Sequence, residues 1–219
     1  MRKSFGIVIF VALFVAMSGA WAGSITVQDY DFSTPTCTVG NSCGSGAYWV
    51  GYGSNGHGVQ TAAGVYATGT YPTAQFGFAN TGDYLLQTLS TNLAANTIYT
   101  LTVVVSDQAT GDTFGPVIRL LAGGTIVASA TAASPNGNTI PPANGVVETW
   151  TLTYTTGASV TAGQALGIYL GSTTIQSDYT NVTLTTAAVG GGGGVPEPAM
   201  FALVGAGLLG LVTRRRFVK

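Results

Sequence analysis

The chain has 219 residues, of which 46% are hydrophobic and only 7% are charged. Its basic residues lie almost entirely at the two ends, so the stretch from Gly23 to Ala188 holds one arginine, Arg119, against seven carboxylates, a net charge of about −6. A surface with a single arginine and no lysine argues against nucleic acid or anionic lipid as a partner. The length of this stretch fits one domain with a substantial core.

The first 22 residues have the three parts of a secretory signal peptide. Arg2 and Lys3 form a basic start, an apolar stretch follows over 5–17, and Ala20-Trp21-Ala22 is an A-x-A cleavage sequence. A segment of this kind is removed on export rather than kept as a membrane span. We therefore expect the mature protein to begin at Gly23, outside the cytoplasm.

Cys37 and Cys43 are the only cysteines. In an oxidising compartment, a pair that closes a short loop usually forms a disulfide. A metal-binding pair is the alternative, although neither a second cysteine pair nor a histidine cluster accompanies it. The sequence predicts a disulfide with a modest effect on stability, because the loop that it closes is short.

Short stretches of alternating apolar and polar residues fill the sequence from 23 to 188, with turns rich in glycine and asparagine between them. This two-residue period is typical of half-buried strands, and threonine favours their exposed positions. Gly123-Gly124 predicts a hairpin turn. Eight to ten short antiparallel strands imply an all-β, two-sheet sandwich. The strands are expected at 25–32, 48–52, 75–79, 84–89, 98–106, 117–121, 125–129, 148–155, 166–170 and 179–185.

Two neighbouring stretches carry a resemblance to a known domain. YLLQTL at 84–89 and LAANTIYTLTV at 93–103 resemble the "L-x-Q-T-L … L-x-A-N-T-x-Y-T-L-x-V" sequence of a jelly-roll domain that often accompanies a bacterial sorting tail. That fold is similar to galactose-binding and carbohydrate-binding-module sandwiches, so the resemblance implies an antiparallel jelly roll. The family often has Asp-Asn-Val in its last strand, whereas this chain has Thr180-Asn181-Val182, with Asp178 two places earlier.

Aromatic and polar residues gather in a glycine-rich region after the cysteines. Sugar rings pack their C–H faces on aromatic planes, while amide and other polar side chains bind their hydroxyls. The alternative is that the aromatic residues belong to the core and that the one histidine of the domain is an exposed loop side chain. The candidate ligand-binding residues are Trp49, Tyr52, Asn55, His57 and Tyr66.

Carboxylates suggest a further ligand, because calcium prefers several hard oxygen donors. A strand at 25–32 would place Asp29 and Asp31 on one side, and a jelly roll brings its first and last strands together, so Asp178 could join them. A structural calcium ion at these three residues is the one candidate cofactor, and ordinary solvated aspartates are the alternative.

Catalysis finds little support in the sequence. One histidine, His57, offers no triad that can be placed by spacing, and no pair of carboxylates stands at a defined separation. We therefore expect no catalytic residues and a protein that is not an enzyme, with hydrolysis of glycans as the weaker alternative.

The chain ends in four parts that follow one another in a fixed order. A glycine-rich linker at 189–195 precedes Pro196-Glu197-Pro198, an apolar stretch runs over 199–212, and Arg214-Arg215-Arg216 follow. As a helix, the apolar stretch would reach about 21 Å, short of a membrane core about 30 Å thick. The arginines predict a cytoplasmic C-terminus.

This tail closely resembles the bacterial PEP-CTERM sorting signal. The resemblance implies recognition by an exosortase, processing near the Pro-Glu-Pro sequence, transient anchoring in the inner membrane, and delivery to the cell surface or extracellular matrix. The predicted organisation is a signal peptide at 1–22, a sandwich at 23–188, a linker at 189–195 and a sorting segment at 196–219.

The predicted function is that of an exported, non-enzymatic module that binds carbohydrate or mediates adhesion in an extracellular polysaccharide matrix. The alternative is a structural matrix protein that assembles with itself and binds no small ligand.

Overall fold

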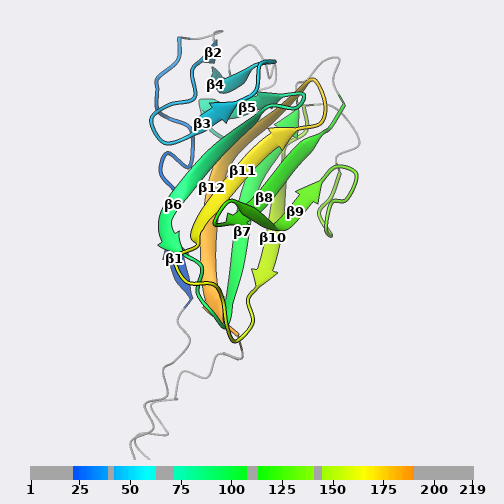
Figure 1. Cartoon of the computed structure of the whole chain (residues 1–219). Helices are drawn as coiled ribbons and strands as arrows, with labels where there is room; N and C mark the ends of the chain where they lie inside the picture. Colours follow the sequence, from blue (N-terminus) through cyan, green and yellow to red (C-terminus); the bar gives the residue numbers. More distant parts are fainter. Residues whose placement is uncertain (1–21, 39–41, 63–71, 108–112, 141–144, 190–219) are drawn as a thin grey trace, which may run out of the picture. The chain divides into compact units, whose positions relative to one another are not determined.

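The computed structural model describes residues 22–38, 42–62, 72–107, 113–140 and 145–189, which belong to one compact unit. These residues form twelve β-strands and no helix (Figure 1). The predicted signal peptide, linker and sorting helix lie outside the described residues. Within the described ranges, no helix has the length and apolar character needed to cross a membrane.

Two antiparallel sheets pack against each other. Sheet A has seven strands in the order β10-β7-β12-β5-β4-β2, with β1 also paired to β12, and sheet B has the order β3-β6-β11-β8-β9. The predicted all-β jelly-roll sandwich is confirmed. The strands are β1 Gly23–Ile25, β2 Ser42–Cys43, β3 Val50–Tyr52, β4 His57–Thr61, β5 Gln75–Asn80, β6 Tyr84–Asn92, β7 Thr97–Asp107, β8 Pro116–Ala122, β9 Thr125–Thr131, β10 Glu148–Thr155, β11 Ala165–Ser172 and β12 Gln176–Ala188.

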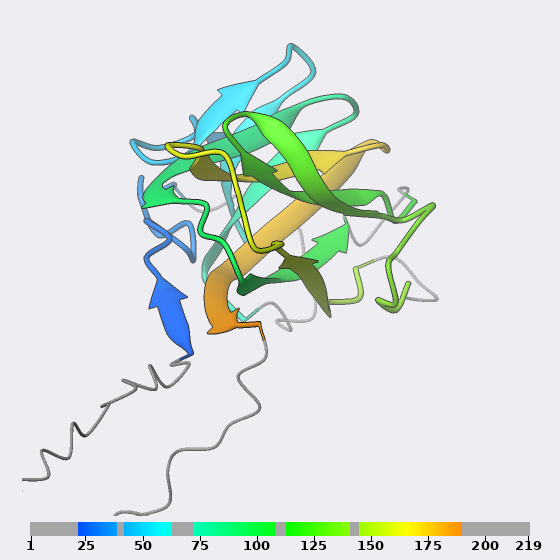
Figure 2. The ribbon, with the colours of Figure 1, turned by 60° about the horizontal axis from the view of Figure 1, so that its bottom comes forward.

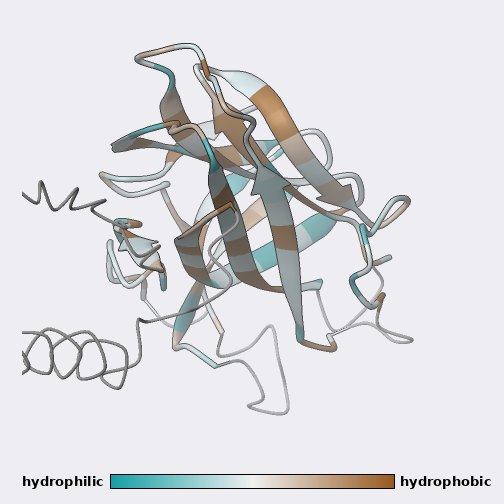
Figure 3. Ribbon diagram, turned by 90° about the horizontal axis from the view of Figure 1, so that it is seen from below, coloured by the Kyte–Doolittle hydropathy of each residue, from teal (hydrophilic) through white to brown (hydrophobic). Residues whose placement is uncertain are grey.

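The core lies between the sheets and follows from the two-residue period of the strands. In β7, Leu101 and Val103 are buried, whereas Thr100 and Thr102 between and beside them remain partly exposed. β10 and β12 alternate in the same way, and their paired registers align the buried leucines of the three strands. Figure 3 shows the resulting bands of apolar and polar residues along the strands.

The first strand is shorter than predicted. β1 ends at Ile25, and the chain then turns, because Asp29 and Phe32 adopt left-handed backbone conformations with φ of 48° and 56°. This turn carries the Phe32 ring into the core, where it stacks on Trp49 with ring centroids 5.0 Å apart. The expectation of a continuous strand over 25–32 is therefore wrong.

A disulfide joins Cys37 and Cys43, whose Cα atoms are 5.8 Å apart. Cys43 belongs to β2 at the edge of sheet A, so the bond attaches the irregular segment before it to that edge. The backbone N–H of Cys37 also donates a hydrogen bond to Gln75 Oε1 on β5, 2.6 Å away. Segment 32–38 is thus held against sheet A at two points.

Tyr179 of β12 connects the two sheets. Its ring is fully buried, its hydroxyl donates to the carbonyl of Gly171 in β11, and it accepts the N–H of Val117 in β8 at 3.2 Å. Burial raises the pKa of this phenol far above its ordinary value, so the donor is permanent. Figure 2 shows β1 and the end of β12 side by side, as their pairing from Gly23 to Thr186 requires.

The contact between Phe32 and β5 gives a stability prediction. A Cβ atom at Gly77 would overlap the buried Phe32 ring, whereas a Cβ at Gly157 would meet no atom within 4 Å. We expect Gly77→Ala to lower the free energy of unfolding by about 1–3 kcal/mol and Gly157→Ala to leave it nearly unchanged. Urea unfolding followed by tryptophan fluorescence measures both, and equal stabilities of the two variants would contradict the packing described.

Candidate functional site

The outer face of sheet A, the face turned away from sheet B, carries buried polar groups near one end. In β12 the side chain of Tyr179 enters the sandwich core, so its neighbours Asp178 and Thr180 project from the outer face. Both are nevertheless fully buried. Residues on an outer face are ordinarily solvated, so this part of the sheet forms a second interior.

Strand register brings a carboxyl, a hydroxyl and an aromatic ring together here. Asp178 is paired with Ser106 of β7 on one side and with Phe78 of β5 on the other. Directly paired residues of antiparallel strands lie on the same face, with side chains in contact range. We call the buried outer-face residues Ser106, Gln176, Asp178, Thr180, Phe76 and Phe78 the Asp178 face.

Hydrogen bonds orient the polar members of this face. Gln176 Nε2 donates to Asp178 Oδ1 at 2.7 Å and to Gln60 Oε1 of β4 at 3.3 Å. The Ser106 hydroxyl donates to the carbonyl of Val146 at 3.2 Å. The carboxyl is therefore fixed in direction by a neighbouring amide, as a group that transfers protons must be.

The apolar wall of the face is distinct from the main core. Phe76 and Phe78 form a separate cluster, against which Ala62 and Val147 pack. Their rings border the row that contains Asp178. An acid beside phenyl rings in a site with little water can hold a proton, and ring faces attract positive charge.

A cavity of about 430 Å³ adjoins this face and is lined by Asp31, Ser33, Thr36, Thr73, Ala74 and Gln75. Thr73 Oγ1 donates to Thr180 Oγ1 at 3.0 Å, and Thr180 in turn lies 3.5 Å from the carbonyl of Asp31. Thr73 thus links the cavity lining to Thr180, which lies two residues from Asp178 on the same face. Its size is within the range of small-molecule sites.

The predicted calcium ligands do not form one site. Among the described residues no group of three or more histidine, cysteine, aspartate or glutamate side chains could hold a metal ion. Asp29 Oδ1 instead accepts the N–H of Thr34 at 3.0 Å within its own turn, and burial raises the pKa of this carboxyl. The grouping of Asp29, Asp31 and Asp178 is therefore wrong, because the first strand on which it depended ends at Ile25.

The predicted ligand-binding residues lie in different environments. Trp49 is 1% exposed, stacks on Phe32 and donates its indole N–H to the carbonyl of Asp29 at 3.0 Å, so its assignment to a ligand platform is wrong. The Asn55 side chain donates to the carbonyl of Thr81 at 2.7 Å. Tyr66 lies outside the described residues.

His57 is the first residue of β4, and its side chain is hydrogen-bonded rather than free in an exposed loop. Its Nδ1 lies 3.2 Å from Oδ2 of the buried Asp83, which also accepts the backbone N–H groups of Ser54, Asn55 and Gly56 at 3.0, 2.8 and 2.6 Å. One carboxylate thus accepts the backbone N–H groups of three successive residues in the turn between β3 and β4. Asn55 and His57 are therefore held by internal bonds.

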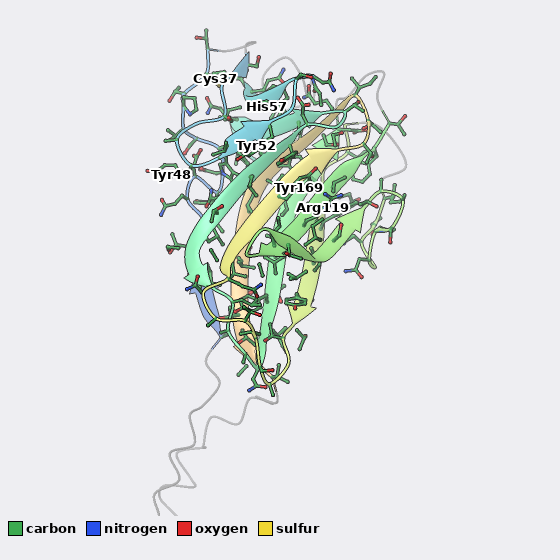
Figure 4. The ribbon with its side chains drawn as sticks, in the orientation of Figure 1. Cys37, Tyr48, Tyr52, His57, Arg119 and Tyr169 are labelled. Atoms are coloured by element: carbon green, nitrogen blue, oxygen red, sulfur yellow. A yellow bond between two sulfur atoms is a disulfide. The ribbon has the colours of Figure 1, made fainter. Side chains whose placement is uncertain are left out.

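Tyr52 remains exposed, at 42%, and begins a row of stacked side chains on the outer face of sheet B. Its ring stacks on Tyr84, which stacks on Tyr169, over which Arg119 lies (Figure 4). Three of these four residues were not singled out from the sequence, because they come from strands that are distant in the chain.

The sequence also failed to identify most of the Asp178 face. Asp178 was noted only as a metal ligand, and Ser106 and the two phenylalanines were not noted. One signal was present: β5 reads Gln-Phe-Gly-Phe-Ala, with large rings on one face and small residues on the other. That pattern indicates a strand that is buried on both faces. A sandwich strand with one solvated face needs large apolar residues on its inner face only.

A jelly-roll sandwich with a fixed, buried carboxyl beside aromatic rings and a cavity has the components of a small-molecule enzyme. Residues 23–185 match the HpiC1-like family, described as HpiC1 cyclase. The match covers most of the chain, which therefore belongs to this family. No curated protein shows significant similarity to the sequence.

Solved structures agree with the family assignment. A cyclase from Fischerella sp. TAU is 25% identical, with a TM-score of 0.65 over 77% of this chain and 99% of that chain. The complex of such a cyclase with 4-(1H-indol-3-yl)butan-2-one is also 25% identical, with a TM-score of 0.62 over 76% and 98%. The Stig cyclase Fisc from the same organism, bound to a pyrrolidinylidene-indole, is 24% identical with a TM-score of 0.64 over 77% and 100%.

These findings correct one prediction and support another. The expectation that the chain is not an enzyme is wrong, because its family and these similar structures are cyclases. They share its jelly-roll fold and do not single out a carbohydrate-binding module. Residues 194–216 match the PEP-CTERM protein-sorting motif. The chain is therefore an exported protein of the exosortase-sorted class, anchored in the membrane before processing.

The Asp83 carboxylate and the groups that bond to it, which we call the Asp83 cluster, give a second stability prediction. Asp83→Ala removes the buried acceptor of three backbone N–H groups and the partner of His57, so we expect a loss of about 2–4 kcal/mol in unfolding free energy. Asp31→Ala is the control, because its carboxyl accepts only a 3.3 Å bond from the N–H of Ser33. Thermal unfolding of both variants measures the difference, and an Asp83 variant as stable as the control would refute the role of the cluster.

Proposed function

We propose that this protein is an exported cyclase that closes a ring in a small organic substrate at the Asp178 face. The observation that carries the proposal is the fully buried Asp178, aligned between Ser106 and Phe78. It lies two residues from Thr180, which hydrogen-bonds to Thr73 in the lining of a cavity of about 430 Å³. Cyclases act by folding a flexible substrate and starting the reaction at one atom, and this arrangement offers both functions.

The proposed chemistry is a proton-initiated isomerisation. The Asp178 carboxyl donates its proton to an unsaturated carbon of the substrate, and the electron pair of a second double bond or aromatic ring then forms the new C–C bond to the resulting cation. A proton lost from the ring-closed cation returns to the Asp178 carboxylate. Substrate and product are isomers, and the acid is regenerated.

The neighbours of Asp178 have separate tasks in this scheme. Gln176, whose amide donates to Asp178 Oδ1, positions the carboxyl. Phe76 and Phe78 present rings that stabilise a passing cation and leave little room for water, which would otherwise trap it as an alcohol. Thr73 supplies a hydroxyl group in the cavity lining and hydrogen-bonds to Thr180.

The substrate class follows from the same chemistry and from the similar structures. Ring closure needs an electron-rich partner for the cation, and the Fischerella complexes contain indole ligands. We propose an aromatic substrate of indole type that bears an alkene side chain. Such a molecule is largely apolar, as the phenylalanine wall requires.

The decisive variant is Asp178→Asn, which keeps the shape of the side chain and removes its proton. We expect turnover of alkenyl-indole substrates to fall by about 10²–10⁴-fold, with the fold retained. Liquid chromatography with mass spectrometry detects the product as an isomer of unchanged mass and altered retention. Glu148→Gln, the same chemical change at the start of β10, is the matched control and keeps full activity.

Two outcomes would refute the proposed site. An Asp178→Asn protein with the turnover of the parent would show that the acid lies elsewhere. Failure of the parent protein both to convert alkenyl indoles and to bind 4-(1H-indol-3-yl)butan-2-one in calorimetry would reject the substrate class.

A carbohydrate-binding role is the second candidate function, and the stacked tyrosines of sheet B, of which Tyr52 is exposed, favour it. Tyrosine rings at a protein surface suit the C–H faces and hydroxyls of sugars. Binding to an extracellular polysaccharide would retain an exported enzyme near the cell. This role is compatible with catalysis, because the stacked tyrosines and the Asp178 face belong to different sheets.

We also propose that the tail is a temporary anchor cleaved near Pro196-Glu197-Pro198. The two prolines fix an extended backbone that a protease can read, and three arginines resist transfer across the membrane. The sorting-motif match to residues 194–216 supports this assignment. Release would deliver the enzyme to the cell surface or the surrounding matrix.

Replacement of Pro196-Glu197-Pro198 by three alanines tests the anchor. We expect this variant to stay in the membrane fraction at its unprocessed mass, because the apolar stretch and the arginines remain. Replacement of Arg214-Arg215-Arg216 by serines is the companion variant, and it weakens retention instead. Release of the alanine variant as efficiently as the parent would show that Pro-Glu-Pro serves only as a linker.

A further inference from the structure

Four side chains from four adjacent strands of sheet B form one continuous stack. The ring centroids of Tyr52 and Tyr84 are 4.9 Å apart, those of Tyr84 and Tyr169 are 4.4 Å apart, and Arg119 Cζ lies 4.6 Å from the centre of the Tyr169 ring. We call Tyr52, Tyr84, Tyr169 and Arg119 the tyrosine row. Figure 4 shows Tyr52, Tyr169 and Arg119 in sequence across the sheet.

A glycine makes this stack possible. Tyr84 is paired with Gly171 of β11, and Tyr169 occupies the same strand two residues earlier. A Cβ atom at Gly171 would lie 2.7 Å from the Tyr169 ring, so Tyr169 leans over the space that this glycine leaves. Arg119, which is paired with Tyr169, extends the stack by one member.

Arg119 has no anionic partner among the described residues. It is the only arginine or lysine between 23 and 188, where seven carboxylates are available. The one ion pair in the described ranges joins His57 and Asp83, and the buried Arg119 Nε has no hydrogen-bond partner. A guanidinium held on an aromatic face without a carboxylate beside it is suited to bind an oxyanion.

A groove continues from the row along the same face. It has a volume of about 180 Å³, and its lining includes Leu86, Thr88, Leu121, Gly123, Gly124 and Gly167. Leu86, Gly167 and Leu121 each lie two residues along the strand from Tyr84, Tyr169 and Arg119, respectively. Because side chains alternate along a strand, these residues occupy the neighbouring outward-facing positions of the same three strands. Gly167 provides a floor without a side chain between the two leucines.

We propose that the groove and the tyrosine row bind an acidic sugar, a uronate unit of an extracellular polysaccharide, with its carboxylate on Arg119. This inference rests on the proposed carbohydrate-binding role and specifies its ligand. Because the domain carries a net charge of about −6, it repels polyanions in general, and a single placed cation therefore selects one carboxylate. Burial raises the pKa of Tyr169, so its phenol remains protonated beside that carboxylate.

The test compares two ligands that differ only in charge. An oligosaccharide with one uronate unit and the methyl ester of the same oligosaccharide are titrated into the full exported protein by isothermal calorimetry at physiological salt. We expect the acid to bind at least about tenfold more tightly than the ester, the equivalent of one charge-assisted pair. Sodium acetate is titrated as a competitor, to separate a sugar-borne carboxylate from a free organic anion.

Variants assign the effect to the row. Arg119→Met removes the preference for the acid and leaves the affinity for the ester unchanged, while Arg119→Lys, which keeps the charge without the planar fork, retains part of it. Tyr52→Ala weakens both ligands. Tyr30→Ala, at a tyrosine that is 50% exposed and outside the row, changes neither.

The outcomes distinguish failure of the uronate assignment from failure of the carbohydrate-binding role on which it rests. Equal affinity for acid and ester, or a preference that survives Arg119→Met, overturns the uronate assignment and leaves carbohydrate binding standing. Complete displacement by acetate at the concentration of the uronate units shows a free-anion site and also overturns it. Binding of neither oligosaccharide rejects both the uronate assignment and the carbohydrate-binding role, without affecting the cyclase activity tested at Asp178.

Discussion

The buried hydroxyl of Tyr179 is the interaction on which the architecture of the site depends. It bonds to β11 and β8 from the centre of sheet A, and so fixes the distance and the register between the two sheets at the end where the site lies. Because side chains alternate along a strand, the inward position of Tyr179 obliges Asp178 and Thr180 to project from the outer face. A shift of β12 by one residue would exchange these positions, and the core would lose a fully buried, hydrogen-bonded ring.

The same alternation explains why much of the fold was predictable. In β7 and β10 every second residue is a large apolar one and the others are mostly threonines, a pattern that specifies both the strand and its inward face. The Gly123-Gly124 hairpin was equally predictable, since both residues adopt positive φ there. The segment after β1 was not predictable, because the left-handed Phe32 is stabilised by tertiary contacts with Trp49 and Gly77.

The site was harder to predict than the fold because it is made by register. Asp178, Ser106 and Phe78 come from β12, β7 and β5, and no spacing in the sequence indicates that they form one row. Asp178 was recognised as a functional carboxylate, yet a metal role was assigned to it in the absence of its aromatic neighbours. Trp49 shows the opposite error: an aromatic residue in a glycine-rich region suggested a ligand platform, and its partner Phe32 was placed on a strand that does not exist there.

The two sheets thus divide the chemistry of the domain between them. Sheet A buries an acid and two phenyl rings close to an open cavity, and such a site suits a reactive cation. Sheet B carries three stacked tyrosines, of which Tyr52 is exposed, and Arg119, the one arginine between 23 and 188. These groups suit a polar, hydrated ligand in rapid exchange. Each surface faces away from the other across a shared core, so a polysaccharide on sheet B leaves the Asp178 face free. A cyclase secreted into a matrix needs this separation, because the groups that hold it in place cannot also be those that exclude water from its substrate.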